Sequence, residues 1–248
     1  MSIFRTSALA ATILISATAC SEGGASDAQQ TAGEEAAGGY LSNVSFDGDA
    51  GVQRGAADAP ITMVEYASIT CTHCKDFHDE VMASTVYDDY VATGKVKFIF
   101  REFPLNQIDV AGFAIARCAG EDDYFSVLHT FFDEQDSVIS AAQDGTILDK
   151  LKDVGASYGL DESDVDACIE DSDIRRQIAA SIDAGQADGV NSTPSIFING
   201  TREETIESRS AEGMSNILDA LLGNAPAEDS PEADETETPV SADETDGN

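Results

Sequence analysis

Basic residues are scarce in this sequence of 248 residues: 13 Lys and Arg stand against 47 Asp and Glu, which gives a formal net charge of −34. The acidic excess persists in the middle of the chain when both ends are left out. Nucleic acids and anionic membrane surfaces attract positive charge, so they are poor partners for such a chain. We therefore expect no nucleic acid among its partners.

The beginning of the sequence lacks an apolar run long enough to cross a bilayer as a helix. Arg5 precedes a short apolar run, a pattern typical of a secretory signal peptide, which we assign to residues 1–19. Small residues end this segment directly before Cys20, so the segment resembles the lipobox of bacterial lipoproteins. Cys20 is then the expected lipidation site and the only membrane contact. The same small residues also suit ordinary signal peptidase, which leaves lipidation open.

Two segments contain too few apolar side chains to build a core. Residues 20–54, rich in Gly, Ala, Ser, Gln and Glu, predict a flexible linker. Residues 224–248 predict an acidic, disordered tail. A single folded domain over residues 55–223 remains between them.

Within this domain the sequence pattern changes from strand to helix and back. In residues 55–105, strands are expected at 61–67 and 95–101, with one helix from Cys71 to Gly94 between them. Residues 106–189 are almost wholly helical, with segments near 107–119, 123–134, 146–157, 161–170 and 172–187. Residues 190–223 return to a strand at 195–199, a hairpin turn at Asn199-Gly200 and a capped helix over 210–222. The order βαβ, helices, ββα indicates an α/β fold with a helical insertion.

Cysteines are few, and their spacing is informative. Cys71-Thr72-His73-Cys74 is a Cys-x-x-Cys motif where a strand ends and a helix begins. Unpaired N–H groups and the helix dipole favour negative charge there, so Cys71 is the expected nucleophilic thiolate and Cys74 the resolving thiol. His73 can add positive charge or a hydrogen bond to the thiolate. A stabilised thiolate means a stabilised reduced form, which indicates an oxidising disulfide.

Other functions of the motif stay open at this point. A structural disulfide, half of a zinc site or an inert pair in a non-catalytic binding module would use the same residues. His78 follows Cys74 by one helical turn, which suggests a copper or zinc carrier, but no nearby fourth ligand is evident. His129, among aromatic residues, is interpreted as part of the packing of the insertion. We predict neither a bound metal nor another cofactor.

Several stretches resemble the DsbA family of thiol–disulfide oxidoreductases. They are Val64-Glu-Tyr-Ala-Ser68 before the Cys-x-x-Cys motif, Phe100-Arg-Glu-Phe-Pro104, Ala116-Arg-Cys-Ala119 and Thr193-Pro-Ser-Ile-Phe-Ile-Asn-Gly200. The resemblance implies a thioredoxin fold with an inserted all-helical subdomain. It also implies that Pro194 is a cis residue which, with its partner Thr193, binds substrate, and that Glu65 accepts or relays the proton of the resolving thiol.

This sequence departs from the best-known DsbA pattern at two positions. Thr72 replaces the usual proline inside the motif, and Thr193 is also seen before the cis-proline of disulfide isomerases. Isomerase activity is therefore an alternative, and a reductase fed by a membrane electron donor is another.

Cys118 and Cys168 fall inside the helical segment. In an exported protein two unpaired thiols would be liabilities, so a structural disulfide is favoured over two buried free thiols. We expect a periplasmic protein that accepts electrons from reduced, cysteine-containing exported proteins. It would pass them to a membrane redox partner that resembles DsbB or VKOR.

Overall fold

The computed structural model describes residues 51–223. The predicted signal peptide, most of the predicted linker, Cys20 and the predicted acidic tail lie outside these residues. None of the helices in the described part is long and apolar enough to cross a membrane.

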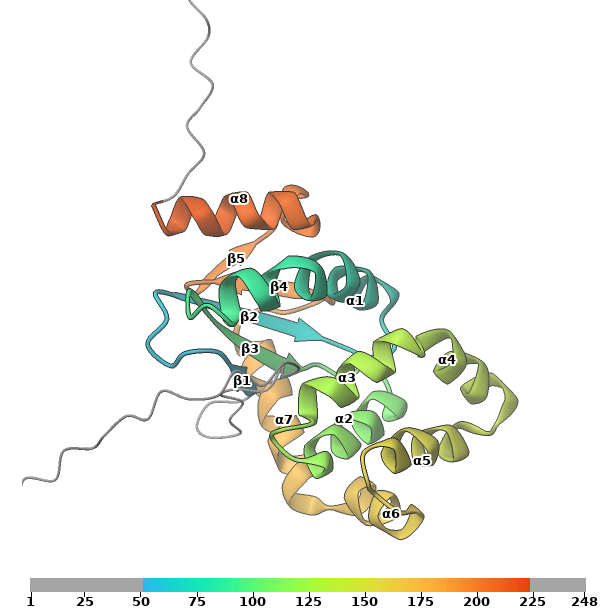
Figure 1. Ribbon diagram of the computed structural model, residues 1–248. Coiled ribbons are helices and arrows are strands. Elements are labelled where there is room, and N and C mark those ends of the chain that lie inside the picture. Colours follow the sequence, from blue (N-terminus) through green and yellow to red (C-terminus); the bar gives the residue numbers. More distant parts are fainter. Residues whose placement is uncertain (1–50, 224–248) are drawn as a thin grey trace, which may run out of the picture. The chain divides into compact units, whose positions relative to one another are not determined.

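A five-stranded mixed sheet with the order β1-β3-β2-β4-β5 forms the centre of the domain (Figure 1). Strands β2 and β3 run parallel, whereas β1–β3, β2–β4 and β4–β5 are antiparallel pairs. The bounds are β1 Val52–Arg54, β2 Ile61–Ala67, β3 Val96–Glu102, β4 Ser195–Ile198 and β5 Thr201–Glu203. The predicted βαβ unit is therefore confirmed, since β2 and β3 are joined through a helical crossover.

The strand β1 contradicts the predicted extent of the flexible linker. Its three residues pair with β3, and both Val52 and Arg54 are buried. The linker was expected to reach residue 54, because so short a strand has no alternating pattern of its own. Its position is set by pairing with the edge of β3, about 45 residues later in the chain, and the residues around Val52 alone do not predict this pairing.

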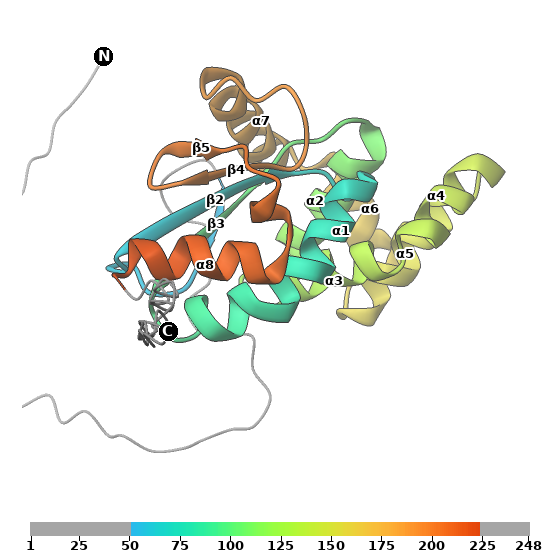
Figure 2. The ribbon, with the colours of Figure 1, turned by 90° about the horizontal axis from the view of Figure 1, so that it is seen from above.

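Helices cover both faces of the sheet (Figure 2). On one face lie α1 (Thr72–Phe77), the π-helix η1 (His78–Val91) and α8 (Ala211–Leu221). On the other, α7 (Ser172–Ala187) packs near a small aromatic cluster that contains Tyr66 and Phe197. Side chains of β2 alternate between the faces, so Tyr66 points toward α7 and its neighbour Glu65 points toward the opposite face.

The crossover helix differs from the single helix predicted over Cys71 to Gly94. It begins as α1 and continues from His78 to Val91 with π-helical winding, which ends in a hydrogen bond from Ala92 N to Tyr87 O of 2.8 Å. Gly94 then takes a positive φ of 74° and turns the chain into β3. The apolar spacing indicated the right buried face but not the change of winding.

The insertion consists of six helices, α2 to α7. They are α2 Gln107–Ala119, α3 Tyr124–Asp133, α4 Gln135–Asp144, α5 Ile147–Ser157, α6 Glu162–Glu170 and α7 Ser172–Ala187. Five of them were predicted within one or two residues. The sixth, α4, was missed because it is mostly polar, and only Gln135 and Val138 are buried on it.

The last part of the domain follows the prediction closely. Asn199 and Gly200 take positive φ angles of 50° and 79° in the turn between β4 and β5. Ser210 caps α8 by accepting a hydrogen bond from Gly213 N. A single 3₁₀ turn, η2 (Glu207–Arg209), was not predicted and lies between β5 and α8. It places Arg209 near the site described below.

Candidate active site

Cys71 lies where the chain leaves β2 and enters α1. It is the N-cap of α1, with an extended backbone, and its carbonyl oxygen accepts hydrogen bonds from Cys74 N at 3.0 Å and Lys75 N at 3.1 Å. The side chain is partly exposed. Both Cys71 and Cys74 are free thiols in the structure, which therefore shows the reduced form of the pair.

The Cys71 sulfur is surrounded by groups that stabilise its negative charge. A hydrogen bond from the Cys74 thiol is the largest cause that lowers its pKa, from the usual 9.0 to about 5. The Thr193 side chain and the backbone N–H groups of Cys74 and His73 lower it further, while burial opposes them. The N–H groups at the helix N-terminus thus contribute to the lowered pKa, after the larger effects of the Cys74 thiol and the Thr193 side chain.

Cys74 has the opposite electrostatic character. Its side chain is fully buried, and this burial raises the pKa of the thiol well above the usual value. The hydrogen bond to Cys71 and the negative charges of Cys71 and Glu65 raise the pKa further. One sulfur of the pair is thus easily ionised and reachable from solvent, while the other holds its proton inside the domain.

Glu65 lies beneath the pair, on the central strand β2 between Phe100 of β3 and Ile196 of β4. It is 2% exposed, and its Oε1 has no hydrogen-bond partner among residues 51–223. Burial is the main cause that raises its pKa from 4.5 to about 8. The positive charge of Arg209 lowers this pKa and the charge of Cys71 raises it. The site therefore contains a buried carboxyl group that can exchange a proton near neutral pH.

The loop before β4 faces Cys71, because β4 pairs with β2 in the sheet. The peptide bond between Thr193 and Pro194 is cis, as the resemblance implied. In the thiol form, Cys71 Sγ donates to the Thr193 carbonyl oxygen at 3.5 Å. In the thiolate form, the Thr193 side chain stabilises the charge. Thr193 therefore contacts the sulfur in both states.

A surface groove adjoins the cis-proline loop. It is lined by His73, Asp76, Phe77, Glu80, Ser192, Thr193, Pro194 and Arg209. Arg209 Nη2 donates to the Pro194 carbonyl oxygen at 3.3 Å, and its guanidinium lies 5.9 Å from the ring of Phe77. Sequence reasoning missed Arg209, because it belongs to no motif and only the turn η2 brings it to the site.

Comparison with known proteins agrees with this geometry. The sequence model of the family described as thioredoxin matches residues 48–220. The chain belongs to the thioredoxin family.

Two solved structures resemble this chain over most of their length. Alpha-DsbA1 of Wolbachia pipientis is 28% identical with a TM-score of 0.60, over 69% of this chain and 90% of that one. A protein-disulfide isomerase from Novosphingobium aromaticivorans is 26% identical with a TM-score of 0.61, over 70% and 98% of the two chains. The resemblance to DsbA and the thioredoxin fold with a helical insertion are confirmed.

A curated relative from Rickettsia bellii is provisionally named a protein-disulfide oxidoreductase. It is 29% identical to this thioredoxin-family chain over 151 residues, which are 60% of the chain and 57% of the relative. The chain thus spans less than two thirds of the relative's length.

The side chain of His73 lies at the surface beside Asp76. This side chain is 85% exposed and lies 3.6 Å from the carboxylate of Asp76. The backbone N–H of His73, and not its imidazole, is among the causes that lower the pKa of Cys71. A residue in the first turn of a helix offers its N–H to the N-cap side chain whatever its own side chain is.

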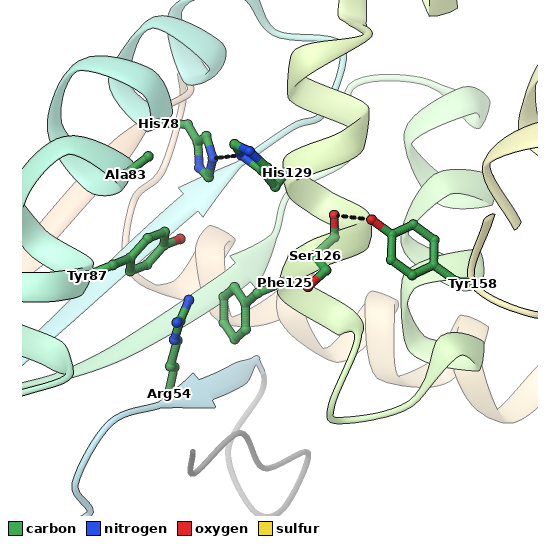
Figure 3. Close-up of a pocket in the computed structure, with 8 residues that line it drawn as sticks. All are labelled: Arg54, His78, Ala83, Tyr87, Phe125, Ser126, His129 and Tyr158. Atoms are coloured by element: carbon green, nitrogen blue, oxygen red, sulfur yellow. Dashed lines mark hydrogen bonds between the residues drawn. The ribbon is translucent and has the colours of Figure 1, made fainter. Parts of the chain in front are cut away.

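His78 pairs with a second histidine, His129 (Figure 3). Its Nε2 lies 2.8 Å from Nδ1 of His129 on α3, and His129 Nε2 lies 3.2 Å from the carboxylate of Asp133. In residues 51–223 no group of three or more His, Cys, Asp or Glu side chains is arranged to hold a metal ion. The alternative of a copper or zinc carrier therefore has no ligand set in the described part of this thioredoxin-family chain.

Cys118 and Cys168 form a disulfide in the structure, with their Cα atoms 6.1 Å apart. It joins α2 to α6 inside the insertion. This bond lies apart from the Cys71 and Cys74 pair along the chain and links two helices that already pack together. Its position suits a structural crosslink.

Proposed function

We propose that this chain is a thiol–disulfide oxidoreductase that donates the disulfide between Cys71 and Cys74 to protein thiols. The observation that carries the proposal is the asymmetry of the pair: Cys71 has a pKa of about 5 at a helix N-terminus, while burial raises the pKa of Cys74. A stabilised Cys71 thiolate stabilises the reduced protein. The disulfide is therefore readily given up, and the protein acts as an oxidant.

The exchange proceeds in two thiolate attacks. A substrate thiolate attacks Cys71 Sγ, which forms a mixed disulfide and breaks the bond to Cys74, whose sulfur leaves with the electron pair. A second substrate thiolate then attacks the substrate sulfur of the mixed disulfide and releases Cys71 as a thiolate. The substrate loses two electrons and two protons. The electrons reduce the pair, Cys74 takes one proton, and the other proton goes to solvent.

Glu65 is proposed to deliver the proton that Cys74 needs on leaving. Its carboxyl group is buried on β2, its charge influences Cys74, and its pKa is about 8. A carboxyl group with this pKa is largely protonated at neutral pH and can donate to a strongly basic buried thiolate. Arg209, whose charge lowers the pKa of Glu65, keeps that proton available for transfer.

Substrate binding is assigned to Thr193 and Pro194 together with the adjoining groove. The carbonyl oxygen of Thr193 lies 3.5 Å from Cys71 Sγ, so a peptide segment bound there would place its cysteine beside the nucleophile. Arg209, bonded to Pro194 O, supports the other side of the same loop.

We further propose that the substrates are reduced, cysteine-containing exported proteins, and that the protein works in the periplasm. The disulfide between Cys118 and Cys168 suits an oxidising compartment. The leader pattern and Cys20 support export and a lipid anchor on the basis of sequence alone. A membrane partner resembling DsbB or VKOR would reoxidise the pair, and no bound cofactor is required for the exchange itself.

The reduction potential of the purified protein against glutathione tests the direction. We expect a value well above the roughly −270 mV of thioredoxin, together with oxidation of a reduced model substrate. A potential as low as that of thioredoxin would favour the reductase alternative. Efficient rearrangement of a scrambled disulfide substrate with little net oxidation would favour the isomerase alternative.

A further inference from the structure

The loop of Ser68 to Thr70, which carries the chain from β2 to Cys71, is held by side chains of the helical insertion. Gln135, the first residue of α4, is fully buried. Its Nε2 donates to the carbonyl oxygens of Ile69 at 2.7 Å and of Cys71 at 3.1 Å. One amide group of the insertion thus binds the backbone on both sides of Thr70.

Asp109 of α2 holds the same loop from a second direction. This buried carboxylate accepts hydrogen bonds from Ser68 Oγ at 2.8 Å, Thr70 N at 2.9 Å and Leu105 N at 2.7 Å. Asn106, which caps α2, donates to the Thr70 hydroxyl at 2.8 Å. The loop is therefore anchored to the first turns of two insertion helices.

The contact of Gln135 with Cys71 O is the one that reaches the nucleophile itself. The same oxygen accepts from Cys74 N and Lys75 N, so it is the first backbone acceptor of α1. The orientation of this carbonyl fixes the N-cap geometry, which aims the N–H groups of His73 and Cys74 at the sulfur. A side chain that holds this carbonyl therefore controls how well those groups reach the Cys71 sulfur.

We propose that Gln135 is a positioning residue for Cys71, through which the helical insertion sets the ionisation and redox behaviour of the nucleophile. The inference rests on the proposed function, since it assumes that Cys71 exchanges disulfides. It assigns a role in the chemistry to a residue that lies outside the βαβ and ββα parts of the fold.

The hydrogen bonds of the Gln135 amide indicate that this side chain positions the loop and does not only fill space in the core. Two carbonyl acceptors fix the amide with its nitrogen toward the loop, because the opposite orientation would bring oxygen against oxygen. Its Oε1 is then buried without a partner among residues 51–223. An apolar side chain of similar length would avoid this unsatisfied oxygen, but it would leave the carbonyl oxygens of Ile69 and Cys71 without the donor that holds them.

Gln135→Met tests the proposal, because methionine keeps the length of the side chain and removes the donor. Thiolate absorbance should show a Cys71 pKa raised by about half a unit to one unit, as expected when the hydrogen bond that Gln135 donates to Cys71 O is lost together with its bond to Ile69 O. The equilibrium constant with glutathione should move about three- to ten-fold toward a less oxidising disulfide. Gln143→Met, the same change at an exposed position of α4, should leave both values as in the unchanged protein. A folded Gln135→Met protein with an unchanged pKa and equilibrium constant would overturn the proposal.

If Gln135→Met fails to fold, the unchanged protein still decides the matter. The NMR signals of the Gln135 side-chain amide should shift with pH at the same midpoint as the Cys71 thiolate absorbance. Signals that stay constant through that titration would overturn the positioning role. Failure of the proposed function would give a different result, because the unchanged protein would then not oxidise a reduced substrate at all.

Discussion

Replacing Glu65 with glutamine should abolish a loss of unfolding free energy that occurs as the pH rises. The carboxyl group is 2% exposed, and its pKa rises from 4.5 to about 8 chiefly because it is buried. Between these pH values the native protein keeps a proton that the unfolded chain has lost. The contribution of Glu65 to stability is therefore full below pH 4.5 and is lost progressively as the pH rises to about 8.

The size of this loss follows from the shift in pKa. Each pKa unit corresponds to about 1.4 kcal/mol, so the loss is roughly 2 to 5 kcal/mol once relaxation around the charge is allowed for. Glutamine does not titrate. The free energy of unfolding of Glu65→Gln, minus that of the unchanged protein, should therefore grow by this amount between pH 4.5 and 8.

Urea unfolding of the two reduced proteins across this pH range provides the assay. Titration of Cys71 also changes stability with pH, but it occurs in both proteins, so only its coupling to the Glu65 charge remains in the difference. Glu170→Gln, the same substitution at an exposed position, is the matched control and should give a nearly constant difference. A constant difference for Glu65→Gln as well would refute the buried, proton-exchanging carboxyl group.

Three further outcomes are expected. Cys71→Ser should abolish disulfide transfer to a reduced substrate, whereas Cys74→Ser, mixed with a substrate that contains a disulfide, should attack it through Cys71 and accumulate a mixed disulfide visible on a non-reducing gel; normal turnover by either variant would contradict the assigned roles. Burial, with a smaller effect of the neighbouring histidine, lowers the pKa of His78 from 6.5 to about 4, so its stability contribution should be lost as the pH falls between these values, by up to about 3 kcal/mol. In His78→Phe the free energy of unfolding should change little over this pH range, and an equally steep fall in the variant would show that His78 is not its cause. Replacing Cys118 and Cys168 by alanine should lower the free energy of unfolding by about 4 kcal/mol, since their separation is 50 residues, and a negligible change in urea unfolding would argue against a stabilising crosslink.

Much of the fold could be predicted because apolar spacing reflects burial. The helices α2 and α7 begin and end at the predicted residues, and the turn at Asn199 and Gly200 has the expected backbone. The helix α4 was not predicted, because so few of its residues are buried. The π-helical winding after Phe77 does leave a trace in the spacing, because the buried pairs Val81/Met82, Val86/Tyr87 and Tyr90/Val91 are four to five residues apart, wider than a turn of an α-helix.

The active site divides in a similar way. Cys71, Cys74 and Pro194 were predicted because a motif, a helix start and a family resemblance indicate them locally. Gln135 and Arg209 were not, because their contacts depend on how distant elements pack. The role of the His73 side chain stays a prediction, since that side chain is largely exposed beside Asp76.

The titration of Cys71 tests the central claim most directly. Thiolate absorbance of the reduced protein, compared with Cys71→Ser to isolate one sulfur, should show an ionisation with a pKa of about 5. An ionisation near 9, as in an ordinary thiol, would contradict the stabilised thiolate on which the proposed disulfide exchange depends.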